Sequence, residues 1–208
     1  MSDYKAVVIG GSAGSFALVL KMLSKLRPDF SLPIIICMHR LKHIRSGLLE
    51  SLNIKSSLPV VEPVDKEKIE GGKVYLAPSN YHMFIEFDGT VSLSIEEMNN
   101  HSRPSIDYTL SSAGMAYRDK CLGIILTGAN KDGAKGLKDI ADKKGFTIVQ
   151  DPKTAEVDTM PKSALKLVKP DLILSPEGIT EFLSKEVYEY SDNFNKSEYL
   201  YDYEIKEK

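Results

Sequence analysis

A serine flanked by glycines follows the first apolar run of this sequence. The apolar run at residues 6–9 leads into Gly10-Gly11-Ser12-Ala13-Gly14, and a helical pattern begins directly afterwards. A Gly-x-Ser-x-Gly motif between a strand and a helix is typical of the nucleophile elbow, in which the glycines permit a tight turn that lifts the serine hydroxyl clear of the sheet. The start of the helix would direct free N–H groups at an oxyanion. The motif indicates acyl transfer with Ser12 as nucleophile, although a small-residue loop that binds phosphate, or only turns, shares the pattern.

Two further polar side chains follow apolar runs and complete a set for serine hydrolysis. His39 comes after the run 34–38, and Asp132 lies in the loop after the run 123–126. Because ligands and catalytic groups gather at the carboxyl ends of parallel strands, Ser12, His39 and Asp132 can share one crevice. His39 would act as base, and Asp132 would fix its tautomer. The chain order Ser, His, Asp differs from that of the α/β-hydrolases, so the elbow alone does not place the chain among them.

Other roles for these residues stay open at this point. A histidine that ends an apolar strand is often structural, and Asp132 could be favoured only by the positive end of a helix dipole. His82, at the mouth of a predicted hairpin, is a rival base. A metal site at His39 and His43 is disfavoured because no glutamate follows His39 and no third ligand is near. The triad itself supplies nucleophile and proton transfer, so we expect no metal and no organic cofactor.

Composition excludes several classes of protein. The 208 residues carry a net charge of −2 with both signs interspersed, which argues against nucleic acid as the main ligand. Cys37 and Cys121 lie within apolar runs, which is typical of buried free thiols in a reducing cytoplasm. No signal peptide is recognisable, and no apolar run approaches the roughly 18 residues of a membrane span. We therefore expect a cytoplasmic protein with no membrane insertion.

Short β-branched runs that alternate with helical patterns must position these side chains. Strands are predicted at residues 5–9, 34–38, 73–77, 122–126, 146–149 and 171–174. Helices are predicted at 16–26, 105–118 and 131–144. This alternation predicts an α/β fold: a three-layer, doubly wound, mainly parallel sheet with helices on both faces.

Two segments depart from this alternation. Residues 82–87 and 90–94 flank Asp88-Gly89, which predicts an antiparallel hairpin with a two-residue turn inserted in the middle of the sheet. Residues 187–208 hold five of the ten tyrosines together with acidic residues and lysines, but almost no aliphatic ones. We therefore expect one catalytic domain at residues 1–186 and a loosely ordered, acidic, tyrosine-rich tail at 187–208.

Six motifs in a fixed order carry a family resemblance. They are residues 9–14 around Ser12, Met38-His39, Ala77-Pro78-Ser79-Asn80-Tyr81-His82, Arg103-Pro104-Ser105-Ile106-Asp107, residues 126–136 around Asp132, and residues 149–155 leading to 160–164. Together they span most of the chain, and they resemble the catalytic domain of the chemotaxis receptor protein-glutamate methylesterases, the CheB family. The resemblance implies a catalytic triad of Ser12, His39 and Asp132.

The resemblance also implies a reaction and its partners. The expected reaction is hydrolysis of glutamate γ-methyl esters on the helices of methyl-accepting chemotaxis receptors, with deamidation of specific glutamines as a second activity. Backbone N–H groups of Ala13 and Ala129 would bind the oxyanion. The alternatives are a non-catalytic binding module in a signalling complex and a hydrolase of an unrelated ester.

The chain also departs from the family pattern. Ser15 stands where the family usually has a second glycine, and Met38-His39-Arg40-Leu41 stands where it has Gln-His-Met-Pro. These changes concern substrate fit rather than the triad. Typical members carry an N-terminal phospho-receiver domain that covers the active site. With the first strand expected at residue 5, we expect a stand-alone form without that control, and a separate response regulator is one expected partner.

Basic residues beside the catalytic histidine have two interpretations. They could attract an acidic receptor helix, or they could form only the solvated start of a helix. They are Arg40, Lys42, His43 and Arg45.

Overall fold

The computed structural model describes residues 4–39 and 47–189, and its centre is a seven-stranded sheet. The strands are β1 (Ala6–Gly11), β2 (Ile34–Met38), β3 (Val60–Val61), β4 (Val74–Leu76), β7 (Cys121–Ile125), β8 (Phe146–Gln150) and β9 (Leu172–Leu174). They lie in the order β3-β4-β2-β1-β7-β8-β9, and every neighbouring pair is parallel. All six strands predicted for this sheet are confirmed, with shifts of one or two residues at their ends. β3 was not predicted.

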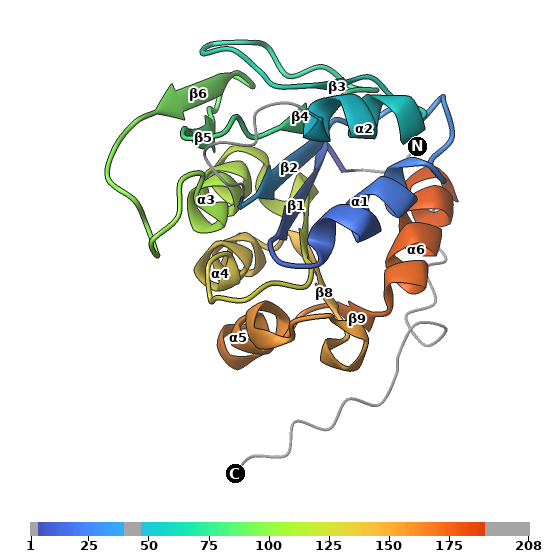
Figure 1. Ribbon diagram of the computed structural model, residues 1–208, viewed down its shortest axis with the longest axis vertical. Coiled ribbons are helices and arrows are strands. Elements are labelled where there is room, and N and C mark those ends of the chain that lie inside the picture. Colours follow the sequence, from blue (N-terminus) through green and yellow to red (C-terminus); the bar gives the residue numbers. More distant parts are fainter. Residues whose placement is uncertain (1–3, 40–46, 190–208) are drawn as a thin grey trace.

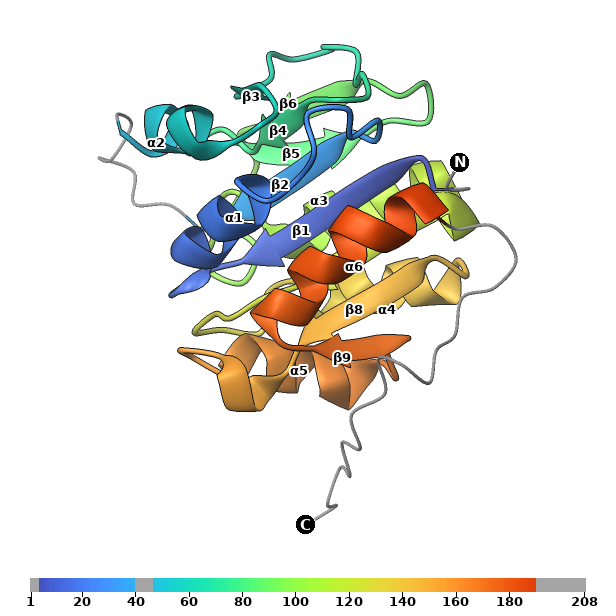
Figure 2. The same cartoon turned by 90° about the vertical axis from the view of Figure 1, so that its right-hand side faces the viewer.

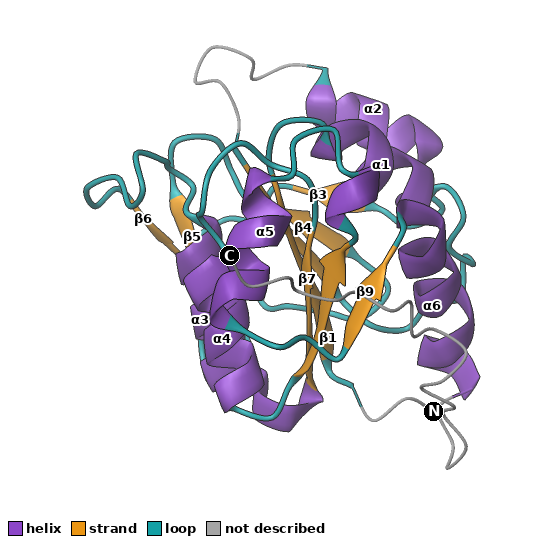
Figure 3. Cartoon of the chain, turned by 90° about the horizontal axis from the view of Figure 1, so that it is seen from below, coloured by secondary structure: helices purple, strands orange, loops and turns teal. Residues whose placement is uncertain are grey.

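Helices cover both faces of the sheet, as predicted. They are α1 (Ser15–Leu23), α2 (Leu48–Lys55), α3 (Ile106–Tyr117), α4 (Ala134–Asp142), α5 (Thr159–Leu167) and α6 (Pro176–Glu189), with short 3-10 turns at Arg118–Lys120 and Pro152–Thr154. Figure 3 shows α3, α4 and α5 on one side of the strands and α1, α2 and α6 on the other. Figure 2 shows α1 and α6 lying across the same face, in front of β1.

Alternate residues of the central strand β1 face two different cores. Val7 and Ile9 belong to the core that contains side chains of α1, α2 and α6, whereas Ala6 and Val8 belong to the core beneath α3, α4 and α5. All four side chains are at most 1% exposed. Because a parallel sheet covered on both faces has no solvent side, its strands are apolar throughout and do not alternate with polar residues.

The strand order reverses beside β1, and this reversal positions the site. From β1 the chain moves outward through β2 and β4, and it then returns to place β7 on the other side of β1 (Figure 1). In an open α/β sheet such a switch point leaves a crevice at the carboxyl ends of the strands. The segments after β1, β2 and β7 therefore converge there, and they contain Ser12, His39 and Asp132 respectively.

The predicted antiparallel hairpin is present and forms its own two-stranded sheet. β5 (His82–Ile85) and β6 (Val91–Ser94) pair with each other, apart from the seven-stranded sheet, and Figure 1 shows them beside α3. Glu86 N donates to Thr90 O, so the loop holds three residues, 87–89, and the predicted two-residue turn is wrong. Of the three loop residues, only Gly89 has a positive φ, of 77°. A two-residue type I′ turn needs two consecutive positive φ angles, whereas a three-residue loop needs one, usually at a glycine.

The end of the catalytic domain was predicted at residue 186, but α6 continues to Glu189. The rest of the predicted tail, from residue 190, lies outside the described residues. Within the described ranges, no helix combines the length and apolar character that crossing a membrane requires.

Candidate active site

The side chains of Ser12, His39 and Asp132 form a continuous series of polar contacts. Ser12 Oγ lies 3.1 Å from His39 Nδ1, and His39 Nε2 lies 2.8 Å from Asp132 Oδ2. The His39 side chain is 15% exposed, whereas that of Asp132 is fully buried. An ionised carboxylate can only accept hydrogen bonds, so His39 Nε2 carries a proton toward Asp132. His39 Nδ1 then presents its lone pair to the Ser12 hydroxyl, which is the arrangement of a general base beside a nucleophile.

The turn between β1 and α1 holds Ser12 through its backbone. Ser12 N donates to Thr127 O at 3.0 Å, and Ser15 Oγ donates to Ser12 O at 2.6 Å. Gly14 has a φ of 79°, and a Cβ there would lie 2.8 Å from the Cβ of Glu156, so only glycine suits this position. Ser15, where the family usually has glycine, is 1% exposed. Its hydroxyl supports the turn from inside and does not face the crevice.

The Asp132 carboxylate lies at the N-terminus of α3. Oδ2 accepts from Ile106 N at 2.8 Å, and Oδ1 accepts from Asp107 N and from Ser105 Oγ, each at 3.1 Å. Burial raises the pKa of Asp132, but the hydrogen bonds from His39 and the two backbone N–H groups outweigh it and hold the net pKa below its ordinary value. The positive end of the α3 dipole favours the same ionised form. Asp132 therefore stays charged at neutral pH.

Asp107, in the first turn of α3, makes the reciprocal contact with α4. Its Oδ1 accepts from Gly133 N at 2.8 Å and from Gly136 N at 2.9 Å, at the start of α4. Asn100 Nδ2 joins the two carboxylates, since it donates to Asp107 Oδ2 at 2.9 Å and to Asp132 Oδ1 at 3.2 Å. Burial raises the pKa of Asp107. The first N–H groups of α3 therefore bind Asp132, which lies just before α4, and those at the start of α4 bind Asp107, which lies in the first turn of α3.

His82, the rival base, is fully buried away from the crevice. Its Nε2 lies 3.0 Å from the Glu97 carbonyl, and its Nδ1 accepts from Ser105 N at 3.1 Å. Both ring nitrogens are therefore used by the backbone. This position supports a structural role, in which His82 holds Ser105, the residue directly before α3.

We expect His82→Ala to lower stability more than catalysis. The substitution leaves Ser105 N and the Glu97 carbonyl without their partner, which costs about 1–3 kcal/mol for each buried group left unsatisfied. Urea unfolding and ester hydrolysis measured on the same preparation test this. A loss of activity as large as that of His39→Ala, with an unchanged unfolding midpoint, would restore His82 as a candidate base.

The predicted oxyanion-hole residues lie in two loops that are fastened together. Ala13 and Ala129 are exposed, and within the described residues neither backbone N–H has a hydrogen-bond acceptor. Thr127 joins the loops, because its carbonyl accepts from Ser12 N and its Oγ1 lies 3.0 Å from Ala13 O. Two unpaired donors beside the nucleophile could bind a developing oxyanion.

Cys37 lies two residues before His39, but it is not a competing nucleophile. Cys37 and Cys121 are free and fully buried, in agreement with the predicted burial. Burial raises the pKa of both thiols, that of Cys121 to about 12. Since the thiolate is the reactive form, both thiols are inert at neutral pH.

The candidate metal site was disfavoured from the sequence, and only part of it can be located. His39 contacts Ser12 and Asp132, whereas His43 and the basic residues at 40, 42 and 45 lie outside the described residues. Over residues 4–39 and 47–189, no three His, Cys, Asp or Glu side chains are grouped to hold a metal ion.

Sequence reasoning missed the polar residues that support the triad. Asn100, Ser105 and Asp107 all contact Asp132, and Asn130 Oδ1 accepts from Asp132 N at 3.1 Å. Ser105 and Asp107 belong to a motif that carries the family resemblance, and Asn130 belongs to another. Membership of these motifs is the available signal, but the motifs alone do not indicate that these residues contact Asp132.

Comparison with known proteins gives a consistent result. The family model described as CheB methylesterase matches residues 7–183. A protein of Leptospira interrogans, described provisionally as a protein-glutamate methylesterase/protein-glutamine glutaminase, is 44% identical over 179 residues, which cover 86% of this chain and 93% of the relative. Protein-glutamate methylesterase/protein-glutamine glutaminase 4 of Geobacter metallireducens is 35% identical over 181 residues, which cover 86% of this chain and 52% of the relative. The crystal structure of the Thermotoga maritima CheB methylesterase catalytic domain matches with a TM-score of 0.82 and 33% identity, over 89% of this chain and 99% of that one.

Proposed function

Because this chain belongs to the CheB methylesterase family, we propose that it is a protein-glutamate methylesterase with Ser12, His39 and Asp132 as its catalytic triad. The reaction converts a glutamate γ-methyl ester and water into glutamate and methanol. The observation that carries the proposal is the unbroken contact from Ser12 Oγ through both nitrogens of His39 to the buried carboxylate of Asp132. The relatives' names also include glutaminase. Glutamine deamidation through the same acyl-enzyme is the second activity that we propose.

The geometry supports a two-step mechanism. Ser12 Oγ attacks the ester carbonyl while His39 Nδ1 takes its proton, and the ionised Asp132 stabilises the imidazolium that forms. The imidazolium then returns the proton to the departing methoxide, which leaves as methanol, and the acyl group remains on Ser12. In the second step His39 activates a water molecule that hydrolyses this acyl-enzyme to glutamate and frees Ser12.

The tetrahedral intermediates of both steps carry an oxyanion. We assign its binding to the N–H groups of Ala13 and Ala129, because both are unpaired within the described part of the chain and Thr127 holds their loops together. Removing one such donor from a serine hydrolase lowers kcat by about 10²–10³. Only the backbone takes part, so the side chain at either position needs only to be small.

The macromolecular partners belong to the same proposal. We assign methylated helices of methyl-accepting chemotaxis receptors as the substrate. We also assign a separate response regulator as a partner that controls access of these helices to the active site. The two buried, free cysteines suit a reducing cytoplasm, where we place the reaction. A module that only binds would not require His39 to contact both Ser12 and Asp132.

Methanol release from methylated receptor helices tests the proposed function. Purified chain should release methanol from methylated helices, and ammonia from helices that carry glutamine at the same sites. Cleavage of small esters with no action on any receptor would indicate another substrate. Binding of the helices without methanol release would favour the non-catalytic alternative.

Activity should rise from acid toward neutral pH, because His39 must be neutral to accept the Ser12 proton. Histidine side chains change charge between about pH 5 and 8. The net pKa of Asp132 lies below its ordinary value, so this carboxylate is ionised throughout that range and the rise reports the imidazole. The measurement is kcat/KM on a small, blocked glutamate γ-methyl ester at several pH values. A flat profile would contradict base catalysis by histidine.

A further inference from the structure

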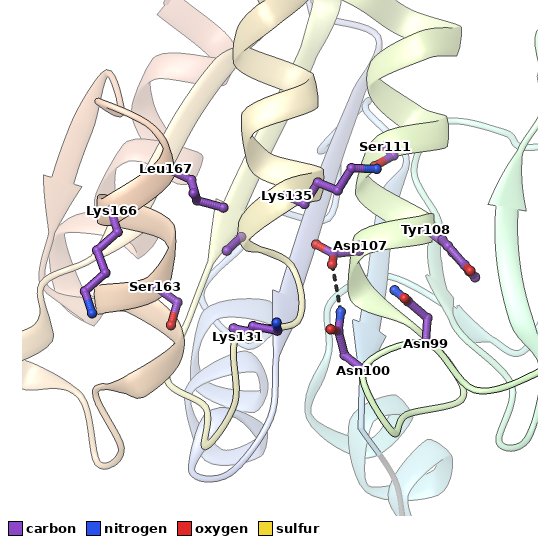
Figure 4. A pocket seen from close by; sticks show the side chains of 11 residues that line it. Asn99, Asn100, Asp107, Tyr108, Ser111, Lys131, Lys135, Ser163, Lys166 and Leu167 are labelled. Atoms are coloured by element: carbon purple, nitrogen blue, oxygen red, sulfur yellow. Dashed lines mark hydrogen bonds between the residues drawn. The ribbon is translucent and has the colours of Figure 1, made fainter.

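A cavity of about 500 Å³ adjoins the triad on the side of Asp132. It lies over the start of α4, with residues of α3 on one side and residues of α5 on the other (Figure 4). Asn100 is shared between the cavity and the catalytic network, because it lines the cavity and donates to the Asp132 carboxylate. The cavity is therefore connected to the triad through Asn100, one hydrogen bond away from Asp132.

Three lysines give this cavity a positive charge that the described residues leave almost uncompensated. Lys131 and Lys166 have no acidic partner within the described part of the chain, and Lys135 has only Asp139, at 3.9 Å. Figure 4 shows Lys131 on the loop before α4, Lys135 at the start of α4 and Lys166 on α5. Other lysines of the same two elements, which do not line the cavity, are paired: Lys138 with Asp142 at 2.5 Å and Lys162 with Asp158 at 2.6 Å.

One acidic side chain lines the cavity, and its oxygens are already occupied. Asp107 accepts from Gly133 N and Gly136 N at Oδ1 and from Asn100 Nδ2 at Oδ2. Asp107 is also only 7% exposed, so it offers little to neutralise lysines in solvent. Among the charged side chains that line the cavity, the three lysines therefore outweigh a single carboxylate that is buried and already hydrogen-bonded, and this charge balance suits an anionic ligand.

We propose that this cavity, which we call the lysine cavity, binds acidic side chains of the receptor helix whose methyl ester is at Ser12. The inference rests on the proposed function. A helix that carries several methylation sites acquires a glutamate carboxylate at each site that has been hydrolysed. Residues three or four apart lie on one face of a helix, one turn or about 5.4 Å along its axis. A neighbouring carboxylate can therefore reach a subsite next to the reacting ester, and long-range attraction by lysines also favours the encounter.

The test compares lysine variants of the full chain on two substrates. We expect Lys131→Gln combined with Lys166→Gln to raise KM for a methylated, glutamate-rich receptor helix by about tenfold or more, with kcat changed by less than about twofold. Its selectivity, the ratio of kcat/KM on that helix to kcat/KM on a small neutral γ-methyl ester, should fall by a similar factor. Added salt should lower the activity of the wild type on the helix more than that of the variant, because it screens exposed charges.

The matched control is Lys138→Gln combined with Lys162→Gln, which removes the same number of charges from α4 and α5 outside the lysine cavity. This control should keep the wild-type KM. A second control uses a receptor helix in which the glutamates next to the ester are replaced by glutamine. On that helix the wild type should already have the high KM, and the cavity variant should raise it no further.

The outcomes separate the two proposals. An unchanged KM in the Lys131 and Lys166 double variant, or an equal rise of KM in both double variants, would overturn the proposal that the lysine cavity binds acidic side chains. Methanol release by the same proteins would still support the proposed esterase activity. If the chain released methanol from none of the methylated receptor helices, the proposed function would be overturned. In that case binding of a glutamate-rich helical peptide, measured by fluorescence anisotropy, would still decide the cavity, since it should weaken about tenfold in the Lys131 and Lys166 variant alone.

Discussion

Replacement of Ser12 by alanine should abolish nearly all methanol release, by a factor on the order of 10⁴–10⁶ in kcat. The substitution removes only the hydroxyl group, and its oxygen is the atom that forms the ester bond of the acyl-enzyme. His39→Ala should cost about as much, because nucleophile and base act as a unit. The double variant should therefore be little worse than either single variant. The measurement is methanol release, together with an unfolding curve that should match that of the wild type.

The matched control is Ser24→Ala, a serine at the end of α1. The Ser24 hydroxyl is exposed and donates only to the Lys21 carbonyl, so its loss should leave turnover unchanged. If Ser12→Ala kept more than about a tenth of the wild-type rate, an acyl-enzyme on Ser12 would be excluded. Additive losses in the Ser12 and His39 double variant would show that the two residues do not act in one step.

Asp132→Asn should lower kcat by about 10³–10⁴, because the amide no longer holds His39 with its Nε2 protonated. The same substitution should also destabilise the fold. The carboxylate accepts from Asn100, Ser105, Ile106, Asp107 and His39. An amide presents one oxygen and one NH₂ group, so some of these donors must face another donor, at a cost of about 1–3 kcal/mol.

The pH dependence of stability gives this prediction a second readout. The pKa of Asp132 is lower in the folded than in the unfolded chain, in which an aspartate titrates near about 3.9. Its contribution to stability is therefore complete above that pH, and it is lost as the pH falls through the lower, folded-state value. The free energy of unfolding of the wild type should fall in this acid range more steeply than that of Asp132→Asn. Asp142→Asn, at an exposed site on α4, is the control, and an identical acid dependence in the wild type and Asp132→Asn would contradict the assignment.

The fold was predictable wherever burial leaves a pattern. Strands buried on both faces are continuous apolar runs, which is why β1, β2 and β7 were located from the sequence. β3 has two residues, and α2 buries only Leu52 among its eight, so neither gives a usable periodicity. The hairpin turn was misjudged because the sequence Asp-Gly suits loops of two lengths, and only Gly89 of this pair takes the positive φ that a two-residue turn needs at both positions.

The triad was predictable because its residues directly follow strands or lie in a strand-end loop, where a sheet brings catalytic groups together. The residues around it were not. Asn100 precedes α3 in a loop, and its contacts with Asp107 and Asp132 exist only because two helix N-termini meet in space. No spacing along the chain encodes such a meeting, which depends on how the helices pack across the sheet.

Two carboxylates, those of Asp107 and Asp132, link the starts of α3 and α4, and this link makes the folding of the two helices mutually dependent. Asp132 binds the first N–H groups of α3, and Asp107, in the first turn of α3, binds those of α4, so each helix start is held by a carboxylate whose position depends on the other. In a hydrogen-exchange measurement, we therefore expect the amides of Ile106, Asp107, Gly133 and Gly136 to open together, as one cooperative unit. Because the acid that orients His39 is itself part of that unit, a chain in which these helices have opened has no assembled triad. We therefore expect esterase activity to be lost whenever the starts of α3 and α4 open, and to return when they close.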